Sequence, residues 1–154
     1  MKRILRPLRD EEWVDAISLV WRVFLNNNAE ECTKYGMEKF FAFLNDDILY
    51  KMYRMGNYRV FACFISNILV GIISARNTNH ISLLFIEDEY QHQHIGTALI
   101  NYLSEYLRKY ESQTFITVDA SPSALSFYEN LGFTVEGHEE TRQGIRYIPM
   151  RLSL

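Results

Sequence analysis

The chain of 154 residues has few of the residues that mark cross-linked, fibrous or linker-rich proteins. Its two cysteines, Cys32 and Cys63, lie far apart and match neither a Cys-x-x-Cys pair nor a metal-ligand spacing. Such sparse cysteine usage is typical of reduced thiols, so we expect a cytoplasmic protein. Seven glycines and three prolines form no linker or low-complexity tract, and no repeat is present. The sequence therefore predicts a single domain over residues 1–154.

Neither sign of charge dominates, because 16 Lys and Arg stand against 19 Asp and Glu, for a net charge of −3. Binding to a phosphate backbone requires a basic surface, so we expect no nucleic-acid partner. Long hydrophobic runs are also missing, since no stretch approaches the ~20 apolar residues of a membrane span. The basic start of the chain is not followed by the apolar segment of a signal peptide. We therefore expect no membrane association.

What the sequence does contain is clear periodicity. Apolar residues recur at helical spacing in four segments, which are 14–25, 29–44, 48–55 and 98–110. Runs rich in β-branched and aromatic residues predict strands at 4–8, 58–65, 68–76, 80–86, 114–119, 133–138 and 145–152. A further helix begins near Pro122 and ends at Gly132. This order predicts a mixed α/β fold, whose mostly antiparallel sheet of about seven strands contains one strand-helix-strand unit.

The most informative segment is the polar loop 91–96 (QHQHIG), between the strand at 80–86 and the helix at 98–110. A loop that opens directly into a helix presents backbone N–H groups without intrahelical partners, and the helix dipole adds positive charge there. Such a loop suits an anion, above all a phosphate. His92 and His94 also have a spacing that suits a metal, but no third ligand lies nearby, so we expect no metal.

Two segments resemble the GNAT superfamily of N-acetyltransferases. Residues 91–96 resemble its pyrophosphate loop, Gln/Arg-x-x-Gly-x-Gly/Ala, and residues 116–133, which end in FYENLGF, resemble its later strand-helix block. The order of elements agrees over nearly the whole chain. The resemblance implies a GNAT-like fold with helices on both faces of the sheet and a splayed strand pair that binds the cofactor. One position departs from the family pattern, because His94 stands where the first glycine usually lies.

The resemblance implies an N-acetyltransferase that moves acetyl from acetyl-CoA to a primary amine directly, in a ternary complex and without a metal. The acceptor stays open between a small-molecule amine and a peptide or protein amine, and similar proteins are commonly homodimers. Tyr128 matches the family's proton donor to the departing thiolate, and Glu87 is the first candidate for the base. The cofactor-binding residues implied are Phe85, Ile86, Gln91, His92, Gln93, His94, Ile95, Gly96, Thr97, Ser121 and Ser123.

Other interpretations of these residues stay open. Tyr128 also fits an ordinary packing aromatic, Glu87 a solvated loop acid, and His80, the second candidate for the base, a strand-end histidine bonded to a turn carbonyl. A GNAT-like module that holds CoA or a partner protein without turnover is the alternative function, and His94 favours it. A third reading is an unrelated α/β protein that binds another phosphate ligand.

Overall fold

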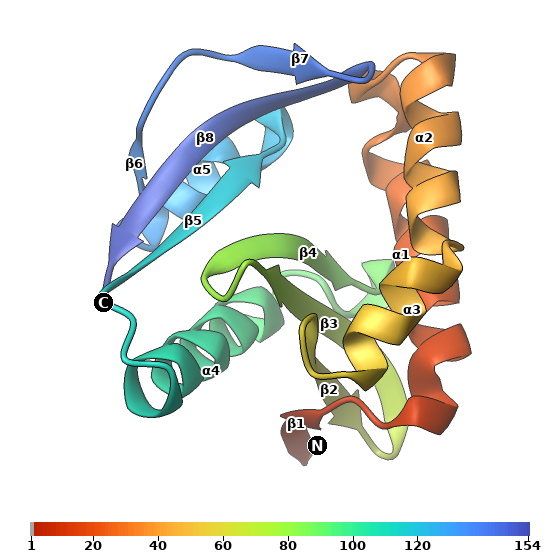
Figure 1. Ribbon diagram of the computed structural model, residues 1–154, viewed down its shortest axis with the longest axis vertical. Coiled ribbons are helices and arrows are strands. Elements are labelled where there is room, and N and C mark those ends of the chain that lie inside the picture. The colour runs from red at the N-terminus through yellow and green to blue at the C-terminus, as the bar shows by residue number, and fades with distance from the viewer. Residues whose placement is uncertain (1) are drawn as a thin grey trace.

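The computed structural model describes residues 2–154 and consists of one sheet with helices on both sides (Figure 1). The strands are β1 (Arg3–Pro7), β2 (Arg59–Ile65), β3 (Ile68–Arg76), β4 (His80–Ile86), β5 (Phe115–Ala120), β6 (Thr134–Val135), β7 (Glu140–Arg142) and β8 (Ile145–Ser153). The helices are α1 (Trp13–Asn27), α2 (Lys34–Leu44), α3 (Asp47–Arg54), α4 (Ile95–Tyr110) and α5 (Leu125–Asn130). Short 3-10 helices are η1 (Asp10–Glu12), η2 (Ala29–Glu31), η3 (Asp88–Tyr90) and η4 (Pro122–Ala124).

The strands lie in the order β1-β2-β3-β4-β5-β8-β6, and β7 pairs with the other end of β8. Every neighbouring pair is antiparallel except β4 and β5, which α4 connects. A parallel pair needs such a crossover, so this is the strand-helix-strand unit that the sequence predicts. The predicted fold class is confirmed, although the sheet has eight strands among the described residues.

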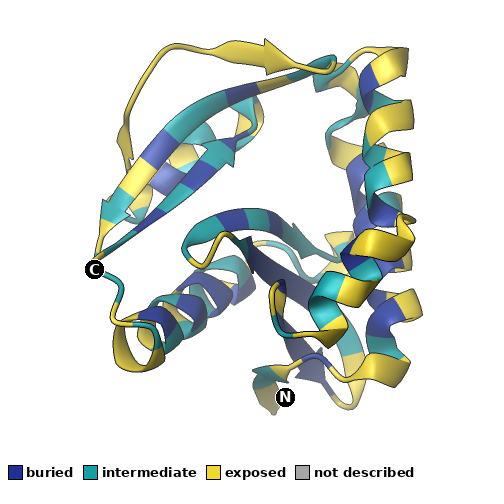
Figure 2. Ribbon diagram, in the orientation of Figure 1, coloured by how far each residue is buried: buried dark blue, intermediate teal, exposed yellow. Residues whose placement is uncertain are grey.

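Two hydrophobic cores lie on opposite faces of the sheet. Alternate residues of β2 divide between them, with Phe61 and Cys63 in the core beneath α4, and Val60 and Ala62 in the core beneath α1. This division follows from the two-residue period of a strand. Figure 2 shows β2 and β3 buried in the middle of the molecule, whereas β7 is exposed along its length.

The parallel strands β4 and β5 pair over only two positions, His80 with Thr117 and Ile81 with Val118, and then diverge (Figure 1). A bulge accompanies the divergence, because the register of β3 against β4 skips Ser82. The buried Tyr58 hydroxyl lies 2.7 Å from Ser74 Oγ and donates to Ser82 Oγ at 2.9 Å. Bulges commonly redirect strands beside functional sites, and this one lies where the strands begin to separate.

Some predicted elements differ in their bounds, since α4 begins at Ile95 and the helix expected from Pro122 is η4 followed by α5, and three differences are larger. The helix expected over 29–44 is interrupted at Cys32, because Thr33 is extended and its Oγ1 caps α2 by accepting a hydrogen bond from Gly36 N. The strand expected over 133–138 shrinks to β6. The strand β7 was not predicted, because its three exposed residues show no apolar alternation. No helix within residues 2–154 is long and apolar enough to cross a membrane.

Candidate active site

The cavity between the diverging strands has a volume of about 1060 Å³. Its walls come from β4, β5, the end of α1, the start of α4, α5 and the turn between β7 and β8. Figure 1 shows β7 and α2 at the same end of the molecule, and Cys32 forms a β-bridge with Ile145 there. The wall therefore combines segments from both halves of the chain.

The start of α4 brings the predicted anion loop to this cavity. The first intrahelical hydrogen bond runs from Ala98 N to His94 O, so the amides of residues 95–97 have no partner within the helix. Those three residues, together with His92 and His94, line the cavity. A row of amides at the positive end of a helix of 16 residues suits a phosphate group.

The two histidines of this loop adopt backbone conformations that favour glycine. His92 has φ +63° and His94 has φ +61°, and His94 is the N-cap of α4. The left-handed region costs a residue with a Cβ roughly 1–2 kcal/mol, although histidine enters it more readily than most side chains. His94 therefore keeps the loop geometry that glycine usually provides.

The two glutamines of the loop form hydrogen bonds with other groups of the protein. Gln91 lines the cavity, and its Nε2 donates to Ile86 O and to Asp88 Oδ1, both at 3.2 Å. Gln93 is not among the described residues that line the cavity, and its carbonyl accepts a hydrogen bond from Arg3 at 2.7 Å. Gln91 thus ties the loop to the end of β4, whereas Gln93 faces the N-terminal strand.

The other residues expected to bind the cofactor also line the cavity: Phe85, Ile86, Ser121 and Ser123. Ser123 has a partner, because its N and its Oγ donate to the Glu31 carboxylate at 3.0 and 2.6 Å. This contact joins η2 to the start of η4 across a separation of 92 residues. It connects two segments of the cavity wall.

Tyr128 lies in the cavity wall on α5, is 5% exposed and packs edge-to-face against Phe127 and Phe133. Burial is the only influence on the titration of its hydroxyl, to which no hydrogen bond from the described residues contributes. Burial raises the pKa of Tyr128 well above its usual value, because the phenolate would lose its hydration. The side chain is therefore held as a neutral phenol, the form that donates a proton.

Glu87 lies outside the described cavity wall that contains Tyr128. Its carboxylate pairs with Arg22 at 2.5 Å, and it is not among the described residues that line the cavity. His80, the second candidate for the base, does line the cavity.

His80 belongs to a polar cluster that the sequence analysis did not find. Its Nδ1 lies 2.8 Å from Thr117 Oγ1, and its Nε2 lies 3.5 Å from Asp119 Oδ2. Contact with His80, and then the charges of Arg142 and Arg76, hold the pKa of Asp119 below its usual value despite partial burial. Asp119 is thus a carboxylate that orients the imidazole in the cavity.

The comparisons with known proteins agree with this geometry. A family model described as an acetyltransferase (GNAT) domain matches residues 28–154. A GCN5-related N-acetyltransferase from Rhodopseudomonas palustris has a TM-score of 0.85 at 21% identity, covering 100% of this chain and 97% of that one. PaiA N-acetyltransferase from Thermoplasma acidophilum, in complex with coenzyme A, has a TM-score of 0.84 at 16% identity, with both chains covered completely.

Spermidine N-acetyltransferase SpeG from Vibrio cholerae has a TM-score of 0.68 at 20% identity, covering 98% of this chain and 93% of that one. No curated protein matches the chain. At these identities the structural likenesses establish the fold, and the family model establishes the relationship. The chain belongs to the GNAT family of acetyltransferases, which confirms the resemblance and the prediction of an acyltransferase. The reading as an unrelated α/β protein is wrong.

Proposed function

We propose that this protein transfers acetyl from acetyl-CoA to a primary amine directly, in a ternary complex. The observation that carries the proposal is the parting of β4 and β5 over a cavity whose wall holds both the α4 amides and Tyr128. Among the similar proteins, PaiA was solved with coenzyme A, and SpeG is named for spermidine acetylation. These names support a CoA thioester as donor and an amine as acceptor.

The cavity residues fit coenzyme A. The amides of residues 95–97 have no helical partner, and His92 and His94 take the backbone angles that present them. In the proposal these amides hold the diphosphate, and Gln91 fixes the loop. The main chain of Phe85 and Ile86, on the free edge of β4, would hold the pantetheine arm, and Ser121 and Ser123 also line the cavity.

Acetyl-CoA, when bound, would supply the acetyl group as a thioester. In the proposal, His80 accepts the proton that the amine loses as its nitrogen forms the new C–N bond. Tyr128 donates its phenolic proton to the sulfur as the C–S bond breaks, and the products are an N-acetyl amine and free CoA thiol. Asp119 stabilises the imidazolium that forms on His80, at 3.5 Å from Nε2.

The test is calorimetric binding of CoA together with thiol release from acetyl-CoA across a panel of amines. Tyr128→Phe is expected to lower kcat by about 10²- to 10⁴-fold, the usual contribution of general acid catalysis, and to leave CoA affinity unchanged. Tyr110→Phe, at a tyrosine that is 69% exposed, is the matched control. A kcat that Tyr128→Phe leaves unchanged across the pH range would contradict the role of Tyr128.

The second candidate function is a module that holds CoA or a partner protein without turnover. His94, in place of the usual glycine, is the observation that favours it. The same experiment separates the two functions, because CoA binding without thiol release for any amine supports the module.

We also propose a cytoplasmic location, since Cys32 and Cys63 are both free thiols. The homodimer that the family resemblance implies is likewise a proposal, and light scattering at several protein concentrations tests it.

A further inference from the structure

Two arginines meet one carboxylate at the start of β4. Arg76 Nη2 lies 3.9 Å and Arg142 Nη1 lies 3.5 Å from the same oxygen of Asp119. Both distances exceed that of a hydrogen bond, so these are loose ion pairs. Arg76 ends β3 and Arg142 ends β7, so two separate segments bring their guanidinium groups to one place.

Most of the hydrogen-bond donors of this pair are unused by the protein. Each guanidinium carries five N–H donors. Arg142 Nη2 donates to Tyr147 Oη at 2.8 Å, and Arg76 Nε is buried without a partner within residues 2–154. Both arginines line the cavity. A guanidinium with open donors is the geometry that binds a carboxylate through two parallel hydrogen bonds.

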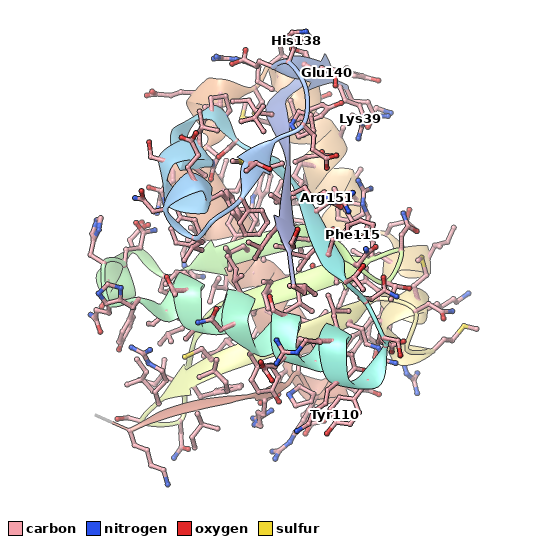
Figure 3. All side chains as sticks on the ribbon, turned by 90° about the vertical axis from the view of Figure 1, so that its left-hand side faces the viewer. Lys39, Tyr110, Phe115, His138, Glu140 and Arg151 are labelled. Carbon is pink, nitrogen blue, oxygen red and sulfur yellow. The ribbon has the colours of Figure 1, made fainter. Side chains whose placement is uncertain are left out.

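The charged residues of the cavity lining also favour a negatively charged ligand. Its described lining contains two acids, Glu31 and Asp119, against four bases, Lys39, Arg76, Arg142 and Arg146, although the chain as a whole has a net charge of −3. Of these bases, Arg146 is paired with Glu139, which lies outside the lining. Figure 3 labels Lys39 on α2 at the same end of the molecule as Glu140 of β7. Positive charge therefore collects in the cavity against the trend of the whole protein.

This positive cluster is separate from the α4 amides. Arg76 pairs with His80 at the start of β4, whereas the loop 91–97 follows its end, about 20 Å away along the strand at 3.3 Å per residue. Asp119 contacts both arginines and His80, the proposed base, so in the proposal the cluster lies beside the acceptor. A polycation such as spermidine would place its charges against these arginines, which is unfavourable.

We propose that the acceptor is a small amine that also carries a carboxylate, as a free amino acid does, and that Arg142 and Arg76 bind this carboxylate. The inference rests on the proposed function and names its substrate class. The amine is directed to His80, and the carboxylate adds the negative charge that Asp119 alone does not supply.

The experiment compares each common L-amino acid with its amide and with the amine left after removal of the carboxylate, using spermidine and an aminoglycoside as polycations. We expect kcat/KM for the best amino acid to exceed that of its decarboxylated amine about tenfold or more, the usual size for charge-assisted hydrogen bonds. Arg142→Gln should abolish this preference, because it should raise KM for the amino acid more than KM for the decarboxylated amine. Arg142→Lys, which keeps the charge and removes the fork, should restore the preference only in part.

Arg108→Gln is the matched control, because Arg108 is an exposed α4 residue that pairs with Glu105 and lies outside the cavity lining described above. Calorimetric titration of the amino acids into CoA-saturated protein gives a readout that does not need turnover, and Arg142→Gln should weaken that binding. Faster acetylation of spermidine or of the decarboxylated amines, or a preference that survives Arg142→Gln, would overturn this inference and leave the acetyltransferase intact. Carboxylate-dependent binding without thiol release would support this inference and contradict the proposed activity.

Discussion

The close approach of the β7–β8 turn to α2 makes Gly144→Ala the sharpest test of how the acceptor end is built. Gly144 has φ +79°, and a Cβ there would lie 2.1 Å from Thr33 Oγ1 and 2.8 Å from Gly36 N. The contact is reciprocal, because a Cβ on Gly36 would lie 2.7 Å from Gly144 O. Thr33 N donates to that same oxygen at 2.9 Å. Two glycines therefore let two backbones meet.

The cost of Gly144→Ala has two parts. The left-handed conformation costs a residue with a Cβ roughly 1–2 kcal/mol. The collision with Thr33 costs roughly 1–3 kcal/mol more, as other overpacked sites do. The total is about 2–5 kcal/mol. Because β7 is exposed throughout, we expect the turn to detach from α2 locally while the rest of the sheet stays folded.

The measurements are amide hydrogen exchange at Thr33 and Gly36, thermal unfolding, and the KM of the acceptor beside the affinity for CoA. Exchange should accelerate at both amides and KM should rise, whereas CoA affinity should hold, because the α4 loop is not involved. Gly56→Ala is the matched control, since Gly56 has φ +81° but only Arg59 Nη1 lies near its Cβ, at 4.0 Å. If Gly56→Ala proved as costly as Gly144→Ala, or if CoA affinity fell with KM, the reasoning would be refuted.

Three further predictions follow from single residues. Burial raises the pKa of Tyr58 from 10.0 to about 12, so the stability that its neutral form contributes is complete below pH 10 and is lost as the pH rises to about 12. In chemical denaturation over this pH range, the free energy of unfolding of Tyr58→Phe should fall by about 3 kcal/mol less than that of the parent protein. The variant leaves Ser74 and Ser82 without that hydroxyl. Equal losses would contradict the assignment. His94→Gly should raise the free energy of unfolding by up to about 1 kcal/mol and leave CoA affinity unchanged; weaker CoA binding in calorimetry would show that the imidazole itself contacts the ligand. Glu87→Gln should leave the pH profile of kcat unchanged, because the Glu87 carboxylate is paired outside the cavity lining. Loss of the acidic limb of the profile in this variant would instead identify Glu87 as the base.

The cofactor end of the site could be predicted because it is built from contiguous sequence. The strand β4, the loop 91–94 and α4 follow one another, so the periodicity of residues 80–110 places the amides without knowledge of the rest of the fold. The backbone angles of His92 and His94 could not be predicted, since histidine usually has negative φ. Only the family pattern indicates that a glycine conformation is needed at residue 94.

The acceptor end could not be predicted, because its parts are far apart in the chain and meet only in the fold. Asp119 lies within the quoted motif, but nothing in its surroundings shows that Arg76 and Arg142 converge on it. The interruption at Cys32 had one local signal, Thr33, whose residue type is favoured at an N-cap, but the apolar pattern over 29–44 obscured it. Glu87 was selected for its position after β4, and its contact with α1 is tertiary.

One end of the site is built from contiguous sequence and the other from distant segments, so we expect donor binding and acceptor choice to respond to different substitutions. Backbone amides at the start of a helix suit a phosphate almost independently of side-chain identity, and the backbone of His94 has the left-handed angles that glycine usually provides. The acceptor end depends on a turn that docks through two glycines and one threonine, and on the guanidinium of Arg142 in that turn. A substitution in the β7–β8 turn can therefore change the acceptor without changing the donor. The acceptor must accordingly be inferred from the charges that this turn brings to the cavity, and those charges favour a carboxylate.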